Sequence, residues 1–471
     1  MGCSCCSTRC WLITGSVAGA VACLLGVILI PVGNTVIEDT VKKEAVLEKG
    51  TTAYENWISA GAPVYRQFWL FDVQNPDEVV ANGSIPQLQQ RGPYTYRTRY
   101  IPKQNITFSE NHTVSFVLPA EAVFEPSLSH GFEEDKVTSL NLAVAGVYNL
   151  IDHAWANMFI ESSKSSLFLR RTVRELLWGY TDPMLKRTLG VFYPYNNTYD
   201  GPYGVFTGKD DINKVSMIDT WNNQPTVPYW NNSYCNMING TDGSSFPPFL
   251  DKKKALYFFS SDICRSVSAD YDGSVDLKGI TVYRYMLPEQ TFASPTVNPD
   301  NKCFCTNYEA TKNCTLAGVL DIKSCKGFPV FISLPHFLHG SPELLDTVHG
   351  LNPNPEEHST YLDVEPITGF TLRFAKRLQI NMMYGPSKEI KILNKVKENT
   401  VFPIVWLNES AALDDETAAR IKNDLFARIE TLEVVQISLI VIGAVVFVLC
   451  LIGICIQERR RRKIIANIHD G

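Results

Sequence analysis

Residues 434–456 form an uncharged apolar stretch, and no other feature constrains the fold of this chain as strongly. Its length matches the ~20 apolar residues that cross the hydrocarbon core of a bilayer. Glu458 and a basic run at residues 459–463 follow it, and Lys and Arg beside a span mark its cytoplasmic end. The alternative is a buried helix of a soluble protein, but such helices are seldom this long or followed so abruptly by charge. We therefore expect a transmembrane helix at 434–456 and a cytoplasmic tail at 457–471.

A second uncharged stretch, residues 11–33, lies near the start of the chain. The alternative is a cleaved signal peptide, with Ala-Val-Ala at residues 20–22 as the small-residue cleavage site. Signal peptides usually have hydrophobic regions of 7–15 residues, whereas this stretch continues well past that site. We therefore expect an uncleaved transmembrane helix. Two spans place both tails, residues 1–10 and 457–471, in the cytoplasm and leave residues 34–433 as one large loop.

The large loop carries the N-glycosylation sequons of the chain, and the two predicted tails carry none. Glycan acceptors belong on a lumenal or extracellular surface. The sequons begin at Asn82, Asn105, Asn111, Asn196, Asn231, Asn239, Asn313 and Asn408. Because this distribution agrees with the basic C-terminal tail, we expect residues 34–433 to be an extracellular ligand-binding domain.

The composition and motifs argue against two classes of function. The formal net charge of −6 is unlike that of nucleic-acid-binding proteins, so no nucleic-acid partner is expected. The chain has no G-x-S-x-G, no H-E-x-x-H and no nucleotide-binding glycine run. Gly208 and Lys209 are followed by Asp210 and not by the Ser or Thr that a P-loop needs. We expect no catalysis, no cofactor and no metal site.

The 13 cysteines fall into two groups. One group lies in or beside the predicted spans and consists of Cys3, Cys5, Cys6, Cys10, Cys23, Cys450 and Cys455. Thiols at the cytoplasmic side of a membrane stay reduced and are the usual acceptors of palmitate. We predict lipidation at Cys3, Cys5, Cys6 and Cys455, whereas Cys23 and Cys450 lie within the spans and are expected to be inert.

The second group lies in the large loop and consists of Cys235, Cys264, Cys303, Cys305, Cys314 and Cys325. An oxidising compartment favours disulfides. A zinc site is the alternative, but the spacing lacks the paired C-x-x-C of such sites. We expect disulfides, and because six cysteines allow 15 connectivities the spacing alone does not choose among them.

The pattern along the loop predicts an α+β fold. Helical spacing occurs at residues 36–60, 140–160, 167–177 and 416–433, and runs rich in β-branched and aromatic residues lie between turn residues elsewhere.

The clearest strand, residues 371–382, alternates apolar and polar side chains, as a half-buried antiparallel strand does. Lys376 falls on its apolar side, where an unpaired ammonium would be costly. Either a bulge at Ala375 and Lys376 turns the lysine outward, or the lysine faces an apolar cavity and meets an anionic head group.

Several blocks of sequence resemble class B scavenger receptors. They are YRQFWLFDVQNP at 65–76, RGPYTY at 91–96, LWGYTDP at 177–183, VFYPYNNT at 191–198, FFSSDICR at 258–265 and PITGFTL at 366–372. The resemblance runs from the first span to the second. INGTD at 238–242, Cys303 and Cys305, and the cysteine-bearing N-terminus are most similar to the platelet glycoprotein IV, or fatty acid translocase, branch of that family.

This resemblance implies an antiparallel β-barrel core, a helical bundle at the membrane-distal apex built from residues 140–160 and 167–177, and an apolar tunnel. It implies the disulfides Cys235–Cys303, Cys264–Cys325 and Cys305–Cys314. It also implies a plasma-membrane receptor, with endosomal, raft and Golgi pools, that takes up fatty acids and acts in endocytosis and signalling. The implied partners are long-chain fatty acids, oxidised low-density lipoprotein, anionic phospholipids, thrombospondin-type repeats and, at the tails, Src-family kinases.

The resemblance also assigns roles to individual residues. Lys164, Arg170, Arg171 and Arg174 are expected to attract anionic lipids at the apex, although a solvated helix face would look the same. Ser162 stands where the family has the first of two apical lysines, which weakens this expectation. Trp155 is either an exposed contact for partners or a buried core residue. Glu133, Glu134 and Asp135 are candidates to meet basic thrombospondin repeats.

Two other functions fit the same topology. A lysosomal sorting receptor of the same family would carry an acidic dileucine signal, but Ile464 and Ile465 follow arginines and have no acid four residues upstream. A two-span ligand-gated channel would need polar lining, and the two spans carry little of it. We therefore favour a receptor and lipid transporter.

Overall fold

The computed structural model describes residues 8–58, 63–98 and 102–469. The chain divides into a helical unit, Met1–Glu44 with Asp415–Gly471, and a large unit, Ala45–Asp414. Cys3, Cys5 and Cys6 lie outside the described residues, so their palmitoylation stays a prediction.

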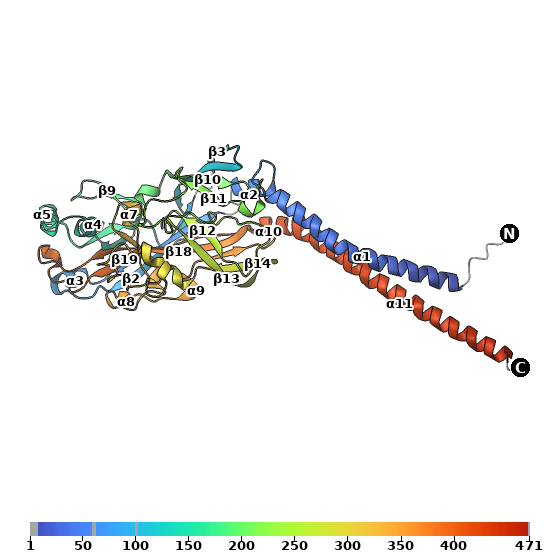
Figure 1. Cartoon of the computed structure of the whole chain (residues 1–471). Coiled ribbons are helices and arrows are strands. Elements are labelled where there is room, and N and C mark those ends of the chain that lie inside the picture. The colour runs from blue at the N-terminus through green and yellow to red at the C-terminus, as the bar shows by residue number, and fades with distance from the viewer. Residues whose placement is uncertain (1–7, 59–62, 99–101, 470–471) are drawn as a thin grey trace. The chain divides into compact units, whose positions relative to one another are not determined.

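The helical unit contains two long helices, α1 (Thr8–Ala45) and α11 (Ala427–His469), drawn in blue and red in Figure 1. Each has a stretch long and apolar enough to cross a membrane, in agreement with the two predicted spans. α10 (Asp415–Ile421) and a π-helical turn at Lys422–Phe426 lead into α11, which confirms the helical pattern predicted there.

The two long helices approach each other at glycines. A Cβ atom on Gly19 would lie 2.7 Å from the carbonyl oxygen of Gly443, and one on Gly443 would lie 2.7 Å from the carbonyl oxygen of Gly19. Gln436 is a polar residue within the second span, and its Nε2 donates to the carbonyl oxygen of Leu29 at 2.8 Å. Small residues at a crossing and a polar side chain that bonds across it are the usual means by which membrane helices associate.

An 11-stranded antiparallel sheet forms the centre of the large unit. Its pairing order is β12 (Leu256–Ser260), β13 (Arg265–Leu277), β14 (Ile280–Met286), β17 (Tyr361–Val364), β18 (Thr371–Tyr384), β19 (Thr400–Ala412), β1 (Val64–Val73), β2 (Leu88–Thr98) and β5 (Ala122–Phe124), with β16 (Val330–Ser333) and β15 (Leu320–Asp321) branching from β18. Among the described strands β12 and β5 do not pair with each other, so the expected barrel is not closed. Closure depends on the meeting of two distant edges, and no local pattern reports that.

A second, four-stranded sheet and two hairpins complete the β-structure. The sheet has the order β11 (Ile218–Trp221), β10 (Thr198–Phe206), β4 (Thr113–Ala120) and β3 (Gln104–Phe108), and the hairpins are β6 (Lys136–Leu140) with β7 (Phe168–Thr172) and β8 (Tyr180–Thr181) with β9 (Thr188–Leu189). One continuous apolar cluster includes buried aromatic residues of both sheets, such as Phe68, Tyr96, Phe116 and Phe402.

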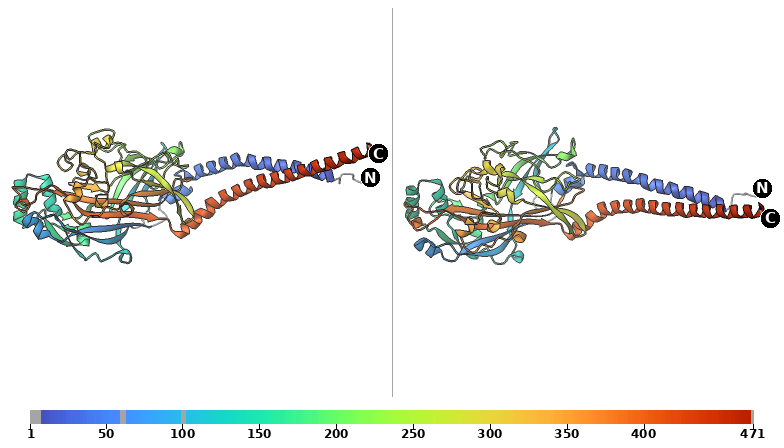
Figure 2. Two further views of the ribbon diagram at one scale, coloured as in Figure 1. Left: turned by 90° about the horizontal axis from the view of Figure 1, so that it is seen from below. Right: turned by 60° about the horizontal axis from the view of Figure 1, so that its bottom comes forward.

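Helices lie around these sheets. They are α2 (Thr52–Ile58), α3 (Pro76–Asn82), α4 (Leu142–Leu150), α5 (His153–Ser163), α6 (Val173–Trp178), α7 (Lys323–Lys326), α8 (Glu343–Asp346) and α9 (Pro355–His358). Figures 1 and 2 show α4 and α5 together at one end of the large unit, with α2 at the opposite end. We call the α4–α5 end the apex.

Three of the predicted helices differ from the structure. The pattern over 36–60, of which residues 59 and 60 lie outside the described residues, is divided between α1 and α2, because the turn between them contains Gly50 at φ +91°. The pattern over 140–160 is also two helices, since Asp152 caps the start of α5 by accepting from the backbone N–H of Ala154.

The pattern over 167–177 is strand β7 followed by α6. A capping box between Thr172 and Glu175 starts α6. The predicted apical helix is therefore correct only in its second half.

The alternation predicts that β18 is half-buried, with Lys376 either turned outward by a bulge at Ala375 and Lys376 or facing an apolar cavity. The strand has no bulge there and is half-buried only in its first part. Its pairing with β19 runs without a register shift from Arg373 to Ile380. From Leu378 onward the strand is buried on both faces.

The polar side chains of this half bond inside the protein. Gln379 Nε2 donates to Asn381 Oδ1 at 2.9 Å, and Asn381 Nδ2 donates to Ser333 Oγ at 3.0 Å. In this half of β18 the alternation therefore reflects an internal polar cluster and not a solvent-facing side.

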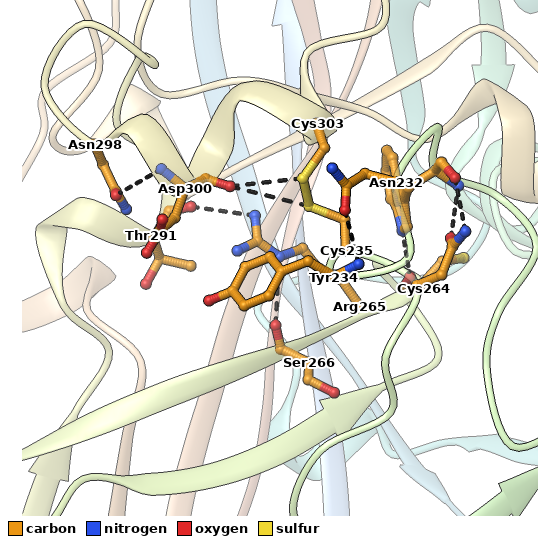
Figure 3. The surroundings of a disulfide bond; sticks show 12 residues. Asn232, Tyr234, Cys235, Cys264, Arg265, Ser266, Thr291, Asn298, Asp300 and Cys303 are labelled. Carbon is orange, nitrogen blue, oxygen red and sulfur yellow. Dashed lines mark hydrogen bonds between the residues drawn. A yellow bond between two sulfur atoms is a disulfide. The ribbon is translucent and has the colours of Figure 1, made fainter.

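Three disulfides cross-link segments in the second half of the large unit, which confirms the expectation of disulfides. They join Cys235 to Cys303, Cys264 to Cys325, and Cys305 to Cys314, the pairs that the resemblance implied. Figure 3 shows the surroundings of the first bridge, where Cys264 and Arg265 lie nearby.

Candidate ligand-binding site

The outer face of α5 is apolar. Trp155, Met158 and Phe159 are exposed, and Trp155 has 60% of its surface open to solvent. Ala156 and Ile160 of the same helix are fully buried in the core. An amphipathic helix usually presents polar side chains outward, so a cluster of large apolar side chains on the exposed face indicates an interaction surface. The sequence left the exposure of Trp155 open.

Lys164 ends α5 in the left-handed conformation, at φ 54° and ψ 36°. Its backbone N–H donates to the carbonyl oxygens of Glu161 and Ile160, which terminates the helix. The side chain is exposed and makes no ion pair with any described residue. Its ammonium group is therefore available to an anionic ligand beside the apolar face of α5.

The three predicted arginines differ in their availability. Arg170 is exposed on β7 and has no ion pair within the described part of the chain. Arg171 lies 3.5 Å from Glu175 and stacks over the Tyr180 ring, with 4.8 Å between Cζ and the ring centroid. Arg174 is paired with Glu133 and, at 3.5 Å, with Glu134. Lys164 and Arg170 are the predicted cations that remain unneutralised.

The acidic run is not a uniform surface. Glu133 is only 8% exposed, and it accepts from the Tyr96 hydroxyl at 2.8 Å as well as from Arg174. Asp135 accepts from the backbone N–H of Phe132 at 3.1 Å. Glu134 has the most exposed side chain of the three. Glu133 therefore acts as the internal partner of Arg174, and Glu134 is the acid that a basic partner would meet first.

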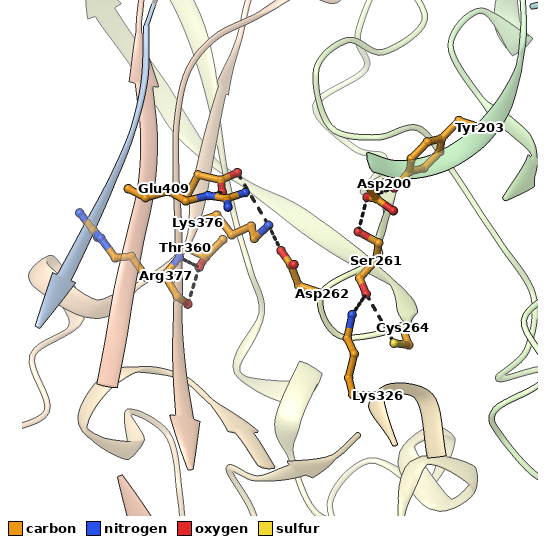
Figure 4. A network of polar contacts seen from close by, with 11 residues as sticks. Asp200, Tyr203, Ser261, Asp262, Cys264, Lys326, Thr360, Lys376, Arg377 and Glu409 are labelled. Carbon is orange, nitrogen blue, oxygen red and sulfur yellow. Dashed lines mark hydrogen bonds and ion pairs between the residues drawn. The ribbon is translucent and has the colours of Figure 1, made fainter. Parts of the chain in front are cut away.

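Lys376 does not face an apolar cavity as an unpaired cation. Its Nζ is paired with Asp262 and lies 3.8 Å from Glu409, which in turn is paired with Arg66 (Figure 4). These two cations and two carboxylates come from β1, β18, β19 and the turn after β12. The charges balance, so this lysine has no spare charge for an anionic head group.

The electrostatics of this cluster keep all its members ionised. Burial raises the pKa of Asp262, but Lys376 and Arg66 outweigh that effect and lower it. Burial likewise opposes ionisation of Glu409, whose pKa is nevertheless lowered by Arg66 and Lys376. Burial lowers the pKa of Lys376, and the attraction of Asp262 and Glu409 raises it above the usual value.

The cluster continues toward the second sheet. Asp200 on β10 accepts from Tyr203 at 2.6 Å, from Ser261 at 2.7 Å and from Trp221 Nε1 at 3.2 Å. Lys326 donates to the carbonyl oxygen of Ser261 at 2.9 Å (Figure 4). Ser261 and the adjacent Asp262 therefore bond to different sheets and join them.

Sequence reasoning missed Arg66, Asp262 and Glu409 as partners of Lys376. A signal was present, because Arg66 and Asp262 are charged residues inside two of the blocks that carry the family resemblance. It also missed Lys391, which pairs with Glu161 of α5 and whose backbone N–H donates to Asn157 at 3.0 Å.

The sequon asparagines separate into two sets. The exposed set consists of Asn82, Asn105, Asn111, Asn231, Asn239 and Asn313. Asn196 and Asn408 are partly buried. Asn408 lies within β19, and its Nδ2, the atom to which a glycan would be attached, donates to Gln67 Oε1 at 3.1 Å. This contact uses one of the two N–H groups of the amide, so the glycan at Asn408 stays a prediction.

Comparison with known proteins places the chain among membrane receptors. The sequence model of the CD36 family matches residues 17–454. The chain is 34% identical to scavenger receptor class B member 1 of Cricetulus griseus, over 96% of this chain and 91% of that protein. It is 36% identical to lysosome membrane protein 2 of Rattus norvegicus, over 87% of each. The lysosome membrane protein 2 of Homo sapiens is also 36% identical, over 82% of this chain and 83% of that protein.

Proposed function

The chain belongs to the CD36 family of class B scavenger receptors, and from that premise we propose that it is a plasma-membrane receptor for anionic amphipathic lipids. It is a two-span membrane protein with a receptor and lipid-binding role. The finer proposal concerns its ligands, which would be long-chain fatty acids and oxidised low-density lipoprotein, and its task, which would be fatty acid uptake. Signalling and endocytosis through the tails are part of the same proposal.

One observation carries the proposal. α5 combines an exposed apolar face, made by Trp155, Met158 and Phe159, with the unpaired cation Lys164 at its end. A fatty acid or an oxidised phospholipid combines an apolar chain with an anionic group, so the two halves of the ligand match the two halves of the surface. Arg170 adds a second cation without an ion pair on β7.

Uptake would follow from transfer of the apolar chain into the large unit. Each buried methylene contributes about 0.8 kcal/mol, so a long acyl chain needs no nucleotide hydrolysis to leave water. The expected apolar tunnel remains part of the proposal. Lys376 is neutralised within its own cluster, so the carboxylate would be held at the apex and not at the centre of β18.

A binding assay on the full-length protein in lipid nanodiscs tests this proposal. We expect Lys164→Ala and Arg170→Ala each to weaken binding of oleate and of oxidised low-density lipoprotein by about threefold to tenfold, since each removes one unpaired charge. Arg171→Ala is the matched control, because Arg171 already pairs with Glu175. Equal binding by wild type, Lys164→Ala and Arg170→Ala would contradict the proposal.

A second proposed ligand class is the thrombospondin-type repeat, a basic protein module. Glu134 supports this proposal because it is an exposed acid that precedes β6. Glu134→Gln should weaken binding of an immobilised repeat, whereas Glu133→Gln should act by destabilising the Arg174 pair. An unchanged affinity for Glu134→Gln would exclude this contact.

Sorting to lysosomes is the competing function within the family. The similarity to lysosome membrane protein 2 favours it, whereas the C-terminal tail supplies no acidic dileucine signal. Surface biotinylation of cells that express the full chain decides between them, because a lysosomal receptor would be found mainly inside the cell.

A further inference from the structure

Arg265, the first residue of β13, is a buried cation without a carboxylate partner. Only 8% of its surface is exposed, and no described Asp or Glu forms an ion pair with it. Nη1 donates to the carbonyl oxygen of Thr291 at 3.4 Å and Nε to that of Ser266 at 3.4 Å. Both contacts are long for hydrogen bonds, and a guanidinium has five N–H donors to satisfy.

An aromatic ring packs against the guanidinium of Arg265. Its Cζ lies 3.6 Å from the centroid of the Phe304 ring, which is a cation–π contact. Figure 3 shows the guanidinium beside Thr291 and Tyr234, close to the Cys235–Cys303 bridge. Burial lowers the pKa of Arg265 to about 9, so the group remains charged at neutral pH.

Arg265 lines a small cavity of about 30 Å³. The other polar lining residues are Thr291, Ser294, Asn301, Thr306, Thr311 and Asp321. This volume holds one or two particles of the size of a water molecule and is far too small for a lipid chain. The cavity lies in the region stapled by the Cys305–Cys314 disulfide, since Cys305 is part of its wall.

Most polar groups of the lining are already engaged. Asn301 donates to the carbonyl oxygens of Gln290 and Ala293. Asp321 accepts from the backbone N–H of Lys323 at 2.8 Å and forms no ion pair with Arg265. The hydroxyl of Thr291 makes no hydrogen bond with any described residue. Thr291 lies beside Arg265, whose Nη1 donates to its carbonyl oxygen, so both side chains can donate to a guest in the cavity.

We propose that Arg265 and Thr291 hold one small monovalent anion, of the halide class, in this cavity. A buried guanidinium without a counterion is costly, and a bound anion removes that cost. Chloride is abundant in the extracellular compartment that the sequons and disulfides indicate. The site is separate from the proposed lipid surface, because α5 contributes no residue to the cavity.

Thermal unfolding of the full-length protein in detergent tests the proposal. The midpoint is measured in sodium chloride, sodium bromide and sodium gluconate at equal ionic strength, because gluconate is too large for the cavity. We expect chloride and bromide to raise the midpoint in a saturable way, by about 2 °C relative to gluconate. Equal midpoints in all three salts would overturn the proposal.

Two variants assign the effect to the site. Arg265→Met removes the charge and Thr291→Val removes the hydroxyl at nearly constant size, and both should abolish or reduce the halide dependence. Arg187→Met, on an exposed arginine outside both sites, should retain it. If Arg265→Met does not fold, two measurements still test whether the cavity binds a halide. They are the halide dependence of Thr291→Val and the anomalous signal of bromide in crystals of the wild type. A retained halide effect in Thr291→Val, or no bromine peak beside Arg265, would overturn the proposal.

Discussion

At the scale of single residues, two histidines are held neutral inside the large unit. The rings of His336 and His358 stack with 4.4 Å between centroids and 8° between planes. Each Nδ1 accepts a backbone N–H, from Asn352 and Asn354 respectively, at 2.9 Å. Burial, followed by the neighbouring His358, lowers the pKa of His336 to about 3. Burial and then Arg377 lower the pKa of His358 to about 4.

This pair predicts a loss of stability in acid. Because the folded pKa values lie below the ordinary value of 6.5, the neutral pair contributes its full stability above pH 6.5. That stability falls as the pH drops toward 4, by about 2 kcal/mol per histidine at pH 5. We expect the unfolding midpoint of the full-length protein to fall accordingly between pH 7 and 5.

His358→Phe should flatten this pH dependence, because phenylalanine keeps the stacked ring but binds no proton. It should also lower stability at pH 7, since the N–H of Asn354 loses its acceptor. The exposed His130→Gln is the control and should leave the slope unchanged. A pH profile of His358→Phe that parallels the wild type would show that other groups control acid stability.

At the scale of secondary-structure elements, α5 determines what the apex can bind. Replacing both Trp155 and Phe159 by Ser removes most of its exposed aromatic surface while the buried Ala156 and Ile160 keep the helix in place. We expect binding of oxidised low-density lipoprotein to fall by about tenfold or more, and thermal stability to change little. Leu128→Ser, at an exposed apolar residue outside the helix, is the control. Full binding by the double variant would exclude α5 as the contact.

Asn408 within β19 is a sequon whose glycosylation can be tested. Asn408 pairs with Gln67 across β1 and β19, and one N–H of its amide donates to Gln67, which leaves the other for a glycan. Asn408→Gln should therefore increase the electrophoretic mobility of the protein by the loss of one glycan, as Asn82→Gln and Asn231→Gln should. An unchanged mobility for Asn408→Gln would show that this sequon is not modified.

Local sequence signals predicted the helices and strands better than they predicted which strands and side chains pair with one another. Uncharged length predicted the two spans, and the alternation of apolar and polar residues located β18. Residues 167–177 were assigned to one helix because Phe168 to Thr172 suits both a strand and a helix, and only pairing with β6 decides. Lys376 meets Asp262 across 114 residues, a contact that strand alternation cannot report. The disulfide pairs came from the family resemblance and not from spacing.

At the scale of the whole molecule, a polar connection joins the two sheets of the large unit. Asp262 holds Lys376 of the large sheet, and the adjacent Ser261 holds Asp200 of the second sheet. Asp262→Asn removes a charge from a balanced cluster and leaves Lys376 and Arg66 to share Glu409. We expect the free energy of unfolding to fall by about 1–3 kcal/mol, as measured by denaturant titration. Asp251→Asn, on an exposed loop, is the control and should be neutral.

The crossing of α1 and α11 has a consequence for inheritance. At Gly19 and Gly443 the backbones themselves touch, so there is no side chain that a substitution could trim. Every missense change at either codon therefore adds a side chain, and the added atoms force the two helices apart. Neighbouring apolar positions can exchange one hydrocarbon for another at little cost. Variation in a population should accordingly be common along both spans and absent at these two positions.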